Sequence, residues 1–406
     1  MKMLKFLHIG DMHLDPKYAK KIEQSLNQII DFCKQNKTNG VIIPGDIWHC
    51  KQSYSNSSAV PLMFNFLRNL SKLVDFIFIT NGNHDTTGSI ALLHQLEPNI
   101  YAYEYPVCLG VATNVDSSFE NVVDLLRSEE GDLPEADFIV SLIPYPHKSM
   151  FISETSIDNN NEAFLEKFEQ IFELIGDATK DYSCPKLLGF HGNVVGSRLS
   201  TGQTLQSQDI MVAPSTLEKA NADYYALNHI HLRQEIKPNM IYAGGIANFN
   251  WGETEQKSFE VVEFDNWTDI GGELEGKMST HQIMLESARP MIKEELQFHS
   301  GEFFYKDADE IQSYQVIEGE YRLRIEVKEN DRKLITEEKI QQLKNIFGED
   351  VKIEFNIIPT ERESRSEKIM NCKNLYDEVK EYAAVVGENI NGSISMKVAQ
   401  IQEVGL

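Results

Sequence analysis

The chain has 406 residues, of which 41% are hydrophobic and 25% are charged, as in an ordinary folded protein of two or three domains. No apolar run approaches the roughly 18 residues that a transmembrane helix needs. Asp11 follows the N-terminal apolar run too closely for a signal peptide, so we expect a cytoplasmic protein that does not act at a membrane. The five cysteines are scattered and form no CxxC pair, which favours free thiols over zinc or disulfide sites.

The formal net charge of −24 disfavours binding of nucleic acid over the whole surface, because the chain repels phosphates at long range. A function on nucleic acid would need a locally positive site, a basic partner, or both. The charge by itself mildly favours a small anionic substrate over a polymer.

In chain order, the first 265 or so residues alternate between short apolar runs and amphipathic segments. The apolar runs predict buried strands at residues 4–9, 41–43, 76–79, 138–143, 187–190 and 224–227. The amphipathic segments predict helices at residues 19–36, 61–73 and 161–175, and a turn-rich β segment follows at 241–264. This alternation predicts a layered α/β domain whose sites form at the carboxyl ends of the strands.

After about residue 275 the pattern changes. Residues 321–327 alternate as a half-exposed strand, residues 337–347 predict a helix, and residues 351–358 predict a second strand, which together make a small β-α-β unit. A charged stretch without apolar residues predicts a linker, and the last 35 residues hold two short amphipathic patterns that need a surface to pack on. We expect a main domain, a small α+β domain, a linker and a helical segment at residues 1–275, 276–360, 361–370 and 371–406.

Polar side chains follow five of the predicted strands. In chain order they are Asp11, His13, Asp46, Asn83, His191, His229 and His231. Gly10, Gly45 and Gly82 lie beside them and permit close backbone approaches. A bridging carboxylate, a second carboxylate, an amide and four imidazoles suit two divalent ions roughly 3.5–4 Å apart. Nitrogen and oxygen donors of this kind favour manganese, iron or zinc over calcium or magnesium.

The expected charge of such a centre indicates its substrate. Two divalent ions, two aspartates and neutral histidines leave a net charge of about +2, which attracts anions within an acidic protein. Bound metal also lowers the pKa of water and so provides hydroxide at neutral pH. The residues therefore predict metal-assisted hydrolysis of a phosphoester.

The motifs that carry these residues are GDMH, GDIWH, GNHD, FHG and HIH, which span residues 10–231. In this order and spacing the chain resembles the calcineurin-type metallophosphoesterases. Its finer features resemble the SbcD family, the nuclease subunit of the bacterial SbcCD repair complex: His49 after GDIW, IPYPH at 143–147, YALNHIH, and the later β-α-β unit. The resemblance implies an α/β/β/α metallophosphoesterase sandwich with a small α+β capping domain and C-terminal helices.

The resemblance also implies roles for individual residues. One metal, by family most often manganese, would be held by Asp11, His13, Asp46 and His231. The other would be held by Asp46, Asn83, His191 and His229, with Asp46 bridging. His84 would protonate or stabilise the leaving oxygen, Asp85 would orient His84, and His49 would contact the phosphate. For His49 the alternative is a solvated loop residue, and for Asp85 it is a turn cap.

By resemblance, the partners would be DNA, an SbcC-like coiled-coil ATPase docked by the C-terminal helices, and a second copy of the chain. Residues 59–73 are a candidate for the dimer contact, with core packing as the alternative. Two other functions remain open: a small-substrate phosphoesterase, and a scaffold with a vestigial metal site. The intact ligands and His84 argue against the scaffold.

Some residues depart from the family or have a plainer explanation. Asn228 stands where the family usually has glycine, and Gly244-Gly245-Ile246 replaces a Gly-Ser-Pro-like turn. Neither change removes a ligand, but both affect the geometry of loops near the site. Arg322 and Arg324 flank a predicted strand, where a solvated face is the better explanation than a DNA contact.

Overall fold

The computed structural model describes residues 3–50, 58–113, 122–128, 135–146, 161–201, 210–270, 273–305, 316–359 and 367–404. Most of the expected linker, residues 361–366, lies outside these ranges. By its internal contacts the chain divides into two compact units. Unit 1 comprises Met1–Glu294, Gln315–Arg322 and Ile346–Lys352, and unit 2 comprises Glu295–Tyr314, Leu323–Asn345 and Ile353–Leu406.

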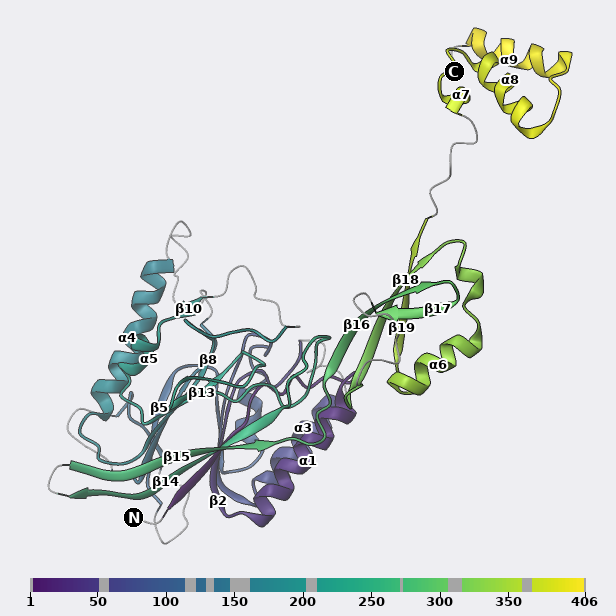
Figure 1. Ribbon diagram of the computed structural model, residues 1–406. Helices are drawn as coiled ribbons and strands as arrows, with labels where there is room; N and C mark the ends of the chain where they lie inside the picture. The colour runs from purple at the N-terminus through teal and green to yellow at the C-terminus, as the bar shows by residue number, and fades with distance from the viewer. Residues whose placement is uncertain are drawn as a thin grey trace. The chain divides into compact units, whose positions relative to one another are not determined.

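The first sheet of unit 1 has six strands and a parallel core (Figure 1). Four strands run parallel in this order: β1 (Leu4–His8), β2 (Thr38–Pro44), β3 (Val74–Thr80) and β4 (Ile100–Tyr103). A short 3-10 helix, η1 (Ala91–Gln95), precedes β4. Beyond β1, the antiparallel strand β14 (Ser258–Ile270) pairs with it, and β15 (Glu273–Met284) pairs antiparallel with β14. The sequence predicts β structure at 241–264 but not this long hairpin.

The second sheet has seven strands in the order β12-β13-β11-β8-β7-β5-β6. Its strands are β5 (Val107–Val111), β6 (Val122–Asp124), β7 (Phe138–Ile143), β8 (Lys186–His191), β11 (Tyr224–Asn228), β12 (Gln234–Lys237) and β13 (Met240–Tyr242). Strands β7, β8, β11 and β13 are parallel, and the outer strands are antiparallel to their neighbours. A separate short ladder pairs β9 (Asn193–Val194) with β10 (Met211–Val212).

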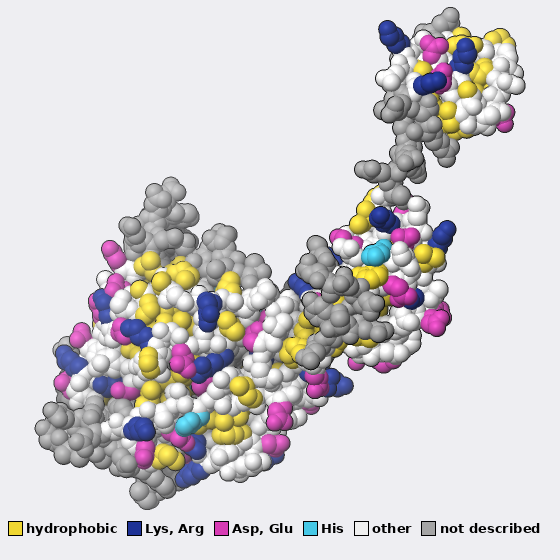
Figure 2. Space-filling view, in the orientation of Figure 1, with side chains coloured by type: hydrophobic (Ala, Val, Ile, Leu, Met, Phe, Trp, Pro, Cys, Tyr) yellow, Lys and Arg dark blue, Asp and Glu magenta, His cyan; other side chains and the backbone are white. Residues whose placement is uncertain are grey.

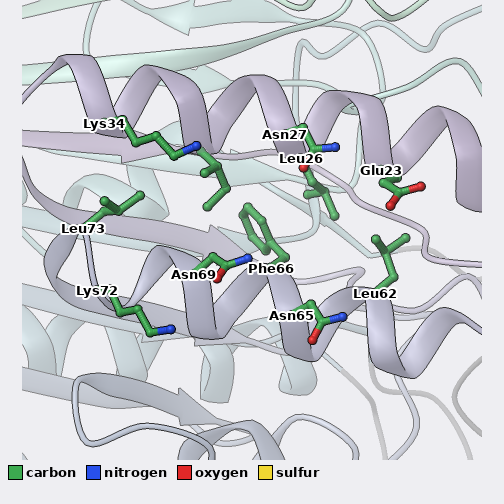
Figure 3. A pocket seen from close by; sticks show the side chains of 11 residues that line it. Glu23, Leu26, Asn27, Lys34, Leu62, Asn65, Phe66, Asn69, Lys72 and Leu73 are labelled. Carbon is green, nitrogen blue, oxygen red and sulfur yellow. The ribbon is translucent and has the colours of Figure 1, made fainter.

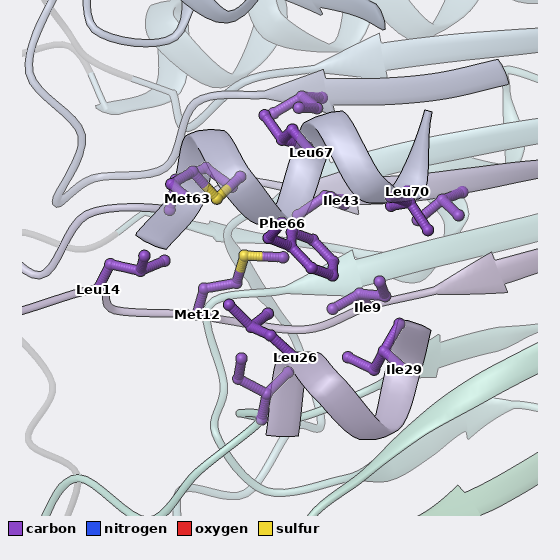
Figure 4. Packing of buried hydrophobic residues seen from close by; sticks show 14 of the residues in the cluster. Ile9, Met12, Leu14, Leu26, Ile29, Ile43, Met63, Phe66, Leu67 and Leu70 are labelled. Carbon is purple, nitrogen blue, oxygen red and sulfur yellow. The ribbon is translucent and has the colours of Figure 1, made fainter. Parts of the chain in front are cut away.

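Helices cover the outer face of each sheet (Figure 1). Helices α1 (Ala19–Gln35) and α3 (Ala59–Leu70) pack on the first sheet, and α4 (Asn161–Thr179) and α5 (Pro214–Glu218) pack on the second. Helix α1 buries the face that its sequence spacing predicts: Ile22, Leu26, Ile29, Ile30 and Cys33. Figure 4 shows side chains of α1 and α3 meeting those of the strands beneath them.

A third apolar cluster fills the space between the two sheets. It joins residues of the first sheet, such as Phe6 and Phe78, to residues of the second, such as Val140 and Leu187, all of them fully or almost fully buried. Two sheets packed face to face, with helices on both outer faces, make a four-layer α/β/β/α sandwich. The predicted fold class is confirmed.

A further four-stranded sheet has the order β17-β16-β18-β19. Its strands are β16 (Met291–His299), β17 (Glu302–Tyr305), β18 (Glu320–Lys328) and β19 (Lys352–Ile358). The 3-10 helix η4 (Arg332–Leu334) and helix α6 (Glu337–Phe347) connect β18 to β19, as the predicted β-α-β unit requires. Alternate residues of β18 are buried, from Tyr321 to Val327, in agreement with the sequence pattern. Strands β16 and β17 are additions that the sequence does not predict.

Three helices end the described chain: α7 (Glu367–Met370), α8 (Leu375–Val386) and α9 (Gly392–Val404). The side chain of Asn374 caps α8 by accepting a hydrogen bond from the Asp377 backbone N–H at 2.9 Å. Gly387 ends α8 with φ = 74°, in the left-handed conformation that glycine adopts without strain. Among the described residues, no helix combines the length and the apolar character needed to span a membrane.

Candidate metal centre

The predicted ligands lie at the carboxyl ends of parallel strands from both sheets. Asp11 follows β1, Asp46 follows β2 and Asn83 follows β3, while His191 ends β8 and His229 follows β11. Because β1, β2 and β3 run parallel, as do β8 and β11, each set of strand ends meets at one edge of its sheet. The sandwich brings the two edges together, so the seven side chains lie close together.

The first group of donors consists of Asp11, His13, Asp46 and His231. Single donor atoms of Asp11, His13 and Asp46 all lie within 4.8 Å of one another. The Nε2 atoms of His13 and His231 are 2.9 Å apart, and His13 Nε2 is 3.5 Å from Asp46 Oδ2. These are the four residues that the family resemblance assigns to one metal.

The second group consists of Asp46, Asn83, His191 and His229. The side-chain oxygen of Asn83 lies 3.1 Å from His191 Nε2 and 2.9 Å from His229 Nδ1. His191 Nε2 is also 3.4 Å from Asp46 Oδ2, the same oxygen that lies 3.5 Å from His13. Asp46 therefore lies between the two groups, in the position that a bridging carboxylate requires.

Buried hydrogen bonds fix which nitrogen of each imidazole faces the centre. The Nδ1–H of His191 donates to the Pro44 carbonyl oxygen at 2.7 Å, so its Nε2 remains for a metal. His231 Nδ1 lies 3.0 Å from the Glu253 carboxylate, which leaves Nε2 facing His13. Nε2 of His229 lies 3.0 Å from the Asn193 side-chain amide, so Nδ1 faces Asn83. Outer partners of this kind orient metal-binding histidines.

The backbone at three of the ligands has a conformation that non-glycine residues rarely adopt. His13, Asp46 and His229 have φ values of 43°, 52° and 107°. Hydrogen bonds hold this strained backbone, because the Met12 and His13 N–H groups donate to the Asp46 carbonyl oxygen at 3.0 and 2.9 Å. Strain of this kind persists only where the surrounding structure enforces it, and it clusters at functional sites.

Glycine is required beside the ligands, as the sequence predicts. A Cβ atom at Gly82 would lie 2.1 Å from Asp46 Oδ1, and one at Gly45 would lie 2.5 Å from His191 Nδ1. Both distances are too short for any side chain. The loops after β2 and β3 therefore approach the ligands as closely as the backbone permits.

Burial and neighbouring charges together set the protonation of the centre. Burial lowers the pKa of His13 well below 6.5 and that of His229 to about 3, so both imidazoles are neutral and keep a lone pair for a metal. Burial raises the pKa of Asp11 to about 6. Burial acts in the same direction on Asp46, but the neighbouring His191 and His13 outweigh it and hold the pKa of that carboxyl well below its usual range.

The donor set fits two divalent cations. Six of the seven side chains are buried, and all their donor atoms are oxygen or nitrogen. Two carboxylates removed from water need compensating positive charge, which divalent ions supply. The buried His and Asp groups are therefore consistent with a dimetal site.

His49 and His84 lie next to the first group of donors. One ring nitrogen each of His13, His49 and His84 lies within 4.8 Å of the others. Nδ1–H of His84 donates to the His49 backbone carbonyl at 2.6 Å, and the His84 backbone N–H donates to Asp46 Oδ1 at 3.0 Å. Both predicted catalytic histidines thus lie beside the ligands, and a hydrogen bond to Asp46 anchors His84.

Asp85, which the resemblance assigns to orienting His84, has its hydrogen bonds with backbone N–H groups. Its buried carboxylate accepts hydrogen bonds from the backbone N–H groups of Trp48 at 2.9 Å, Gly82 at 2.8 Å and Ile47 at 3.4 Å. The His49 carbonyl accepts from the ring of His84. The Asp85 carboxylate thus links the loops after β2 and β3 through their backbone N–H groups. A turn cap, the alternative considered for this residue, makes the same kind of hydrogen bond.

Sequence reasoning missed the buried carboxylate of Glu253. It contacts His231 Nδ1 at 3.0 Å through one oxygen and the Lys257 ammonium at 2.9 Å through the other. Glu253 and Lys257 are both buried. Burial opposes ionisation of Glu253, but His231 and Lys257 outweigh it and hold its pKa below the usual range. No motif surrounds Glu253, so only the folded chain reveals its contact with a ligand.

Asn228, the departure from the family pattern, lies fully buried beneath the centre. Its side-chain amide donates to the Ile9 carbonyl oxygen at 3.2 Å and accepts from His8 Nε2 at 3.1 Å, while its backbone carbonyl accepts from the Gly192 N–H at 3.1 Å. The other ring nitrogen of His8, Nδ1, lies 2.9 Å from the Tyr224 hydroxyl, so both nitrogens of this buried ring have a partner. Asn228 thus contacts the chain segments that carry Asp11 and His191.

The fold and the site together define a metallophosphoesterase. The family model for calcineurin-like phosphoesterases matches residues 4–232, which is more than half of the chain. The chain belongs to the calcineurin-like phosphoesterase family, and its activity is that of a metal-dependent phosphoesterase, a hydrolase.

Two solved structures show similarity to this chain. One crystal structure is 12% identical and covers 68% of this chain and 98% of its own, with a TM-score of 0.35. The other is a candidate 5'-nucleotidase from Staphylococcus aureus in complex with alpha-ketoglutarate. It is 14% identical and covers 76% of this chain and 57% of its own, with a TM-score of 0.39. No curated protein matches the chain in sequence.

Proposed function

We propose that the chain is the nuclease subunit of an SbcCD-like DNA repair complex, and that it hydrolyses DNA phosphodiesters with two manganese ions. The observation that carries this proposal is the anchored pair of His49 and His84 beside the first group of metal donors. The leaving oxygen of a DNA phosphodiester is a sugar alkoxide, which is a poor leaving group unless an acid protonates it. A positioned imidazole meets this need.

Each residue of the pair has its own part in this mechanism. The His49 carbonyl holds Nδ1–H of His84, so His84 presents Nε2 to the substrate and, as an imidazolium, gives its proton to the leaving oxygen. The bond from the His84 N–H to Asp46 keeps this acid at a fixed place relative to the metal ligands. The chemistry that two bound divalent ions supply is polarisation of the phosphoryl oxygens and a lowered pKa for water.

The test compares the wild-type chain with His84→Gln on linear DNA in manganese. The substitution should reduce cleavage by about 10²- to 10⁴-fold, the usual contribution of general acid catalysis, while metal content stays at the wild-type level. Near-normal cleavage by the variant would remove His84 from the mechanism. A loss of metal would show that the ring supports the ligands instead.

A small phosphodiester or nucleotide is the second candidate substrate, and the net charge of −24 favours it. Hydrolysis of a generic small diester, measured beside DNA under the same conditions, separates the two. Turnover of the small ester alone, even after addition of the ATPase partner, would favour this second function.

The partner in this proposal is an SbcC-like coiled-coil ATPase, which docks on α8 and α9. Figure 2 shows hydrophobic side chains on the surface of these helices. The large exposed ones are Tyr376, Tyr382, Val385, Val386, Ile394, Met396 and Ile401. Helices this short are not stable in isolation unless such residues find a surface. Amphipathic helices commonly dock on apolar grooves of helical partners. The partner would also add DNA-binding surface to that of this acidic chain.

The proposed assembly contains two copies of the chain, joined through α1 and α3. Between these helices lies a cavity of about 550 Å³ with an apolar floor that includes Leu26 and Phe66. Figure 3 shows Glu23 at one end of it and Lys34 and Lys72 at the other. A two-fold axis across the cavity would place the acidic end of one copy against the basic end of the other.

Charge reversal tests this dimer. Lys72→Glu should convert the dimer to a monomer in light scattering, and the combined Glu23→Lys and Lys72→Glu exchange should restore it, because the pairing is reciprocal. A wild-type chain that stays monomeric at high concentration would contradict the dimer. Core packing would then be the only role of residues 59–73.

A further inference from the structure

Trp251 occupies a rigid turn whose neighbours support the metal ligands. The Glu253 N–H donates to the Asn250 carbonyl at 3.1 Å, and Gly252 between them has φ = 101°, which is the geometry of a type II turn with Trp251 at its second position. The Asn250 amide donates to the Glu253 carboxylate at 2.7 Å, and the Gly252 N–H donates to the Met291 carbonyl at 2.7 Å. The backbone on both sides of the indole is therefore fixed, while the side chain is partly exposed.

Two positively charged side chains lie near the indole ring of Trp251. The Lys352 ammonium lies 5.2 Å from the ring centroid, and the guanidinium carbon of Arg322 lies 6.0 Å from it, both within the range of cation–π contacts. All three residues belong to unit 1. In a chain with a net charge of −24, two positive side chains beside one partly exposed aromatic ring form a local site of the kind that a polyanion needs.

The turn also connects directly to the metal centre. Phe249, two residues before Trp251, packs its ring 5.1 Å from that of His13 and 5.7 Å from that of His231. Glu253, two residues after Trp251, contacts His231 Nδ1. The segment that holds the indole is thus the same segment that supports the ligands of one metal.

We propose that Trp251, Arg322 and Lys352 form a nucleotide-binding position for the DNA strand outside the scissile phosphate. A base of the strand stacks on the indole, and the two cations bind its phosphates. Stacking on aromatic rings is tolerant of sequence, as a nuclease of broad specificity requires. The assignment rests on the proposed function in taking nucleic acid as the substrate. It also replaces, for Arg322, the solvated face expected from the sequence.

The test measures binding separately from cleavage. A labelled single-stranded oligonucleotide is titrated with the full chain in calcium, and binding is followed by fluorescence anisotropy. Trp251→Ala should weaken binding by about 10-fold or more, and Trp251→Phe should keep most of the affinity, because a ring remains. Lys352→Gln should lower the salt dependence by about one counterion. Lys237→Gln, a substitution of an exposed lysine paired with Glu218, is the matched control.

Intrinsic fluorescence adds an independent signature. Stacking of a base on Trp251 should quench part of the tryptophan emission when the oligonucleotide binds, and Trp251→Phe should abolish that quenching. Trp48 is fully buried and should not respond. Metal content of each variant, measured in parallel, should equal that of the wild type.

The outcomes separate this inference from the proposed function. Equal oligonucleotide affinity in the wild type and in Trp251→Ala would overturn the inference, even if DNA is cleaved. Loss of metal in Trp251→Ala would also overturn it, because the residue would then act through the ligands. If the oligonucleotide binds through Trp251 but manganese-loaded protein does not cleave it, the inference stands and the nuclease function fails.

Discussion

At the metal centre, carboxylates and imidazoles are buried at the ends of five strands, whereas on α8 and α9 large apolar side chains are exposed. Both regions depart from the usual distribution, in which polar groups face water and apolar groups face the core. The first region is rigid and held by backbone hydrogen bonds to residues such as Asp46 and Asp85. The second consists of two short helices in which Val398 is the single buried residue among the side chains that the structure describes. The donor set of the centre fits cations, and the proposed function supplies an apolar surface for the helices.

Removal of the bridging carboxylate should have the largest effect on the first region. Asp46→Ala should abolish binding of both ions, because Asp46 Oδ2 lies near His13 and near His191. Metal content after dialysis, measured by mass spectrometry, checks this. Asp75→Asn, an exposed aspartate of β3, is the control and should keep the wild-type content. Two tightly bound ions in Asp46→Ala would contradict the bridging position.

The acid sensitivity of the buried region should be the next largest effect. Burial lowers the pKa of His8 from 6.5 to about 4, so the folded chain keeps this imidazole neutral. The unfolded chain binds a proton below pH 6.5, so the stability from this residue is complete above that pH. As the pH falls from 6.5 towards 4, the free energy of unfolding should drop by up to about 3 kcal/mol.

Denaturant titration of the metal-free chain between pH 4 and 6.5 measures this slope. His8→Gln should flatten it, whereas His281→Gln, at an exposed position, should leave it unchanged. An equally steep slope in His8→Gln would assign the acid sensitivity to other groups.

Loss of the outer partner of His231 should weaken the centre without removing it. Glu253→Gln keeps the shape of the side chain but not its charge, and should reduce metal affinity by about 10- to 100-fold. Glu255→Gln is a matched control, because the Glu255 carboxylate also contacts Lys257 at 2.6 Å but accepts its other hydrogen bond from Ser200 at 2.7 Å. Competition with a chelator measures the difference. Equal losses in both variants would assign the effect to Lys257.

The smallest effect on stability should come from the terminal helices. Tyr382→Asp combined with Met396→Asp changes two exposed side chains, so the free energy of unfolding of the phosphoesterase part should shift by less than about 0.5 kcal/mol. Co-purification with the coiled-coil ATPase should nevertheless be lost, while Lys380→Gln keeps it. Retention of the ATPase by the double variant would place docking elsewhere.

The same comparison explains what the sequence predicts well. Ligands such as Asp11 and Asn83 follow continuous apolar strands at short spacing, so local pattern locates them. The helical spacing of α1 and the alternation of β18 likewise locate the core faces. These features depend on residues close together in the chain, whose periodicity carries the information.

Features that depend on distant contacts were not predictable. Glu253 meets His231 across 22 residues, and Asn228 meets Ile9 across 219 residues. The hydrogen bonds of Asp85 were likewise not predictable, because the backbone of the loop after β2 donates to that carboxylate, while the His49 carbonyl of the same loop accepts from the ring of His84. Residue type and spacing do not indicate either of these hydrogen bonds.

The measurement that tests the central claim most directly is anomalous diffraction from crystals grown with manganese. The account predicts two peaks roughly 3.5–4 Å apart on either side of Asp46. One should be bound by Asp11, His13 and His231, and the other by Asn83, His191 and His229. A single ion, or an ion held by His49 and His84 instead of these residues, would contradict the two-metal centre.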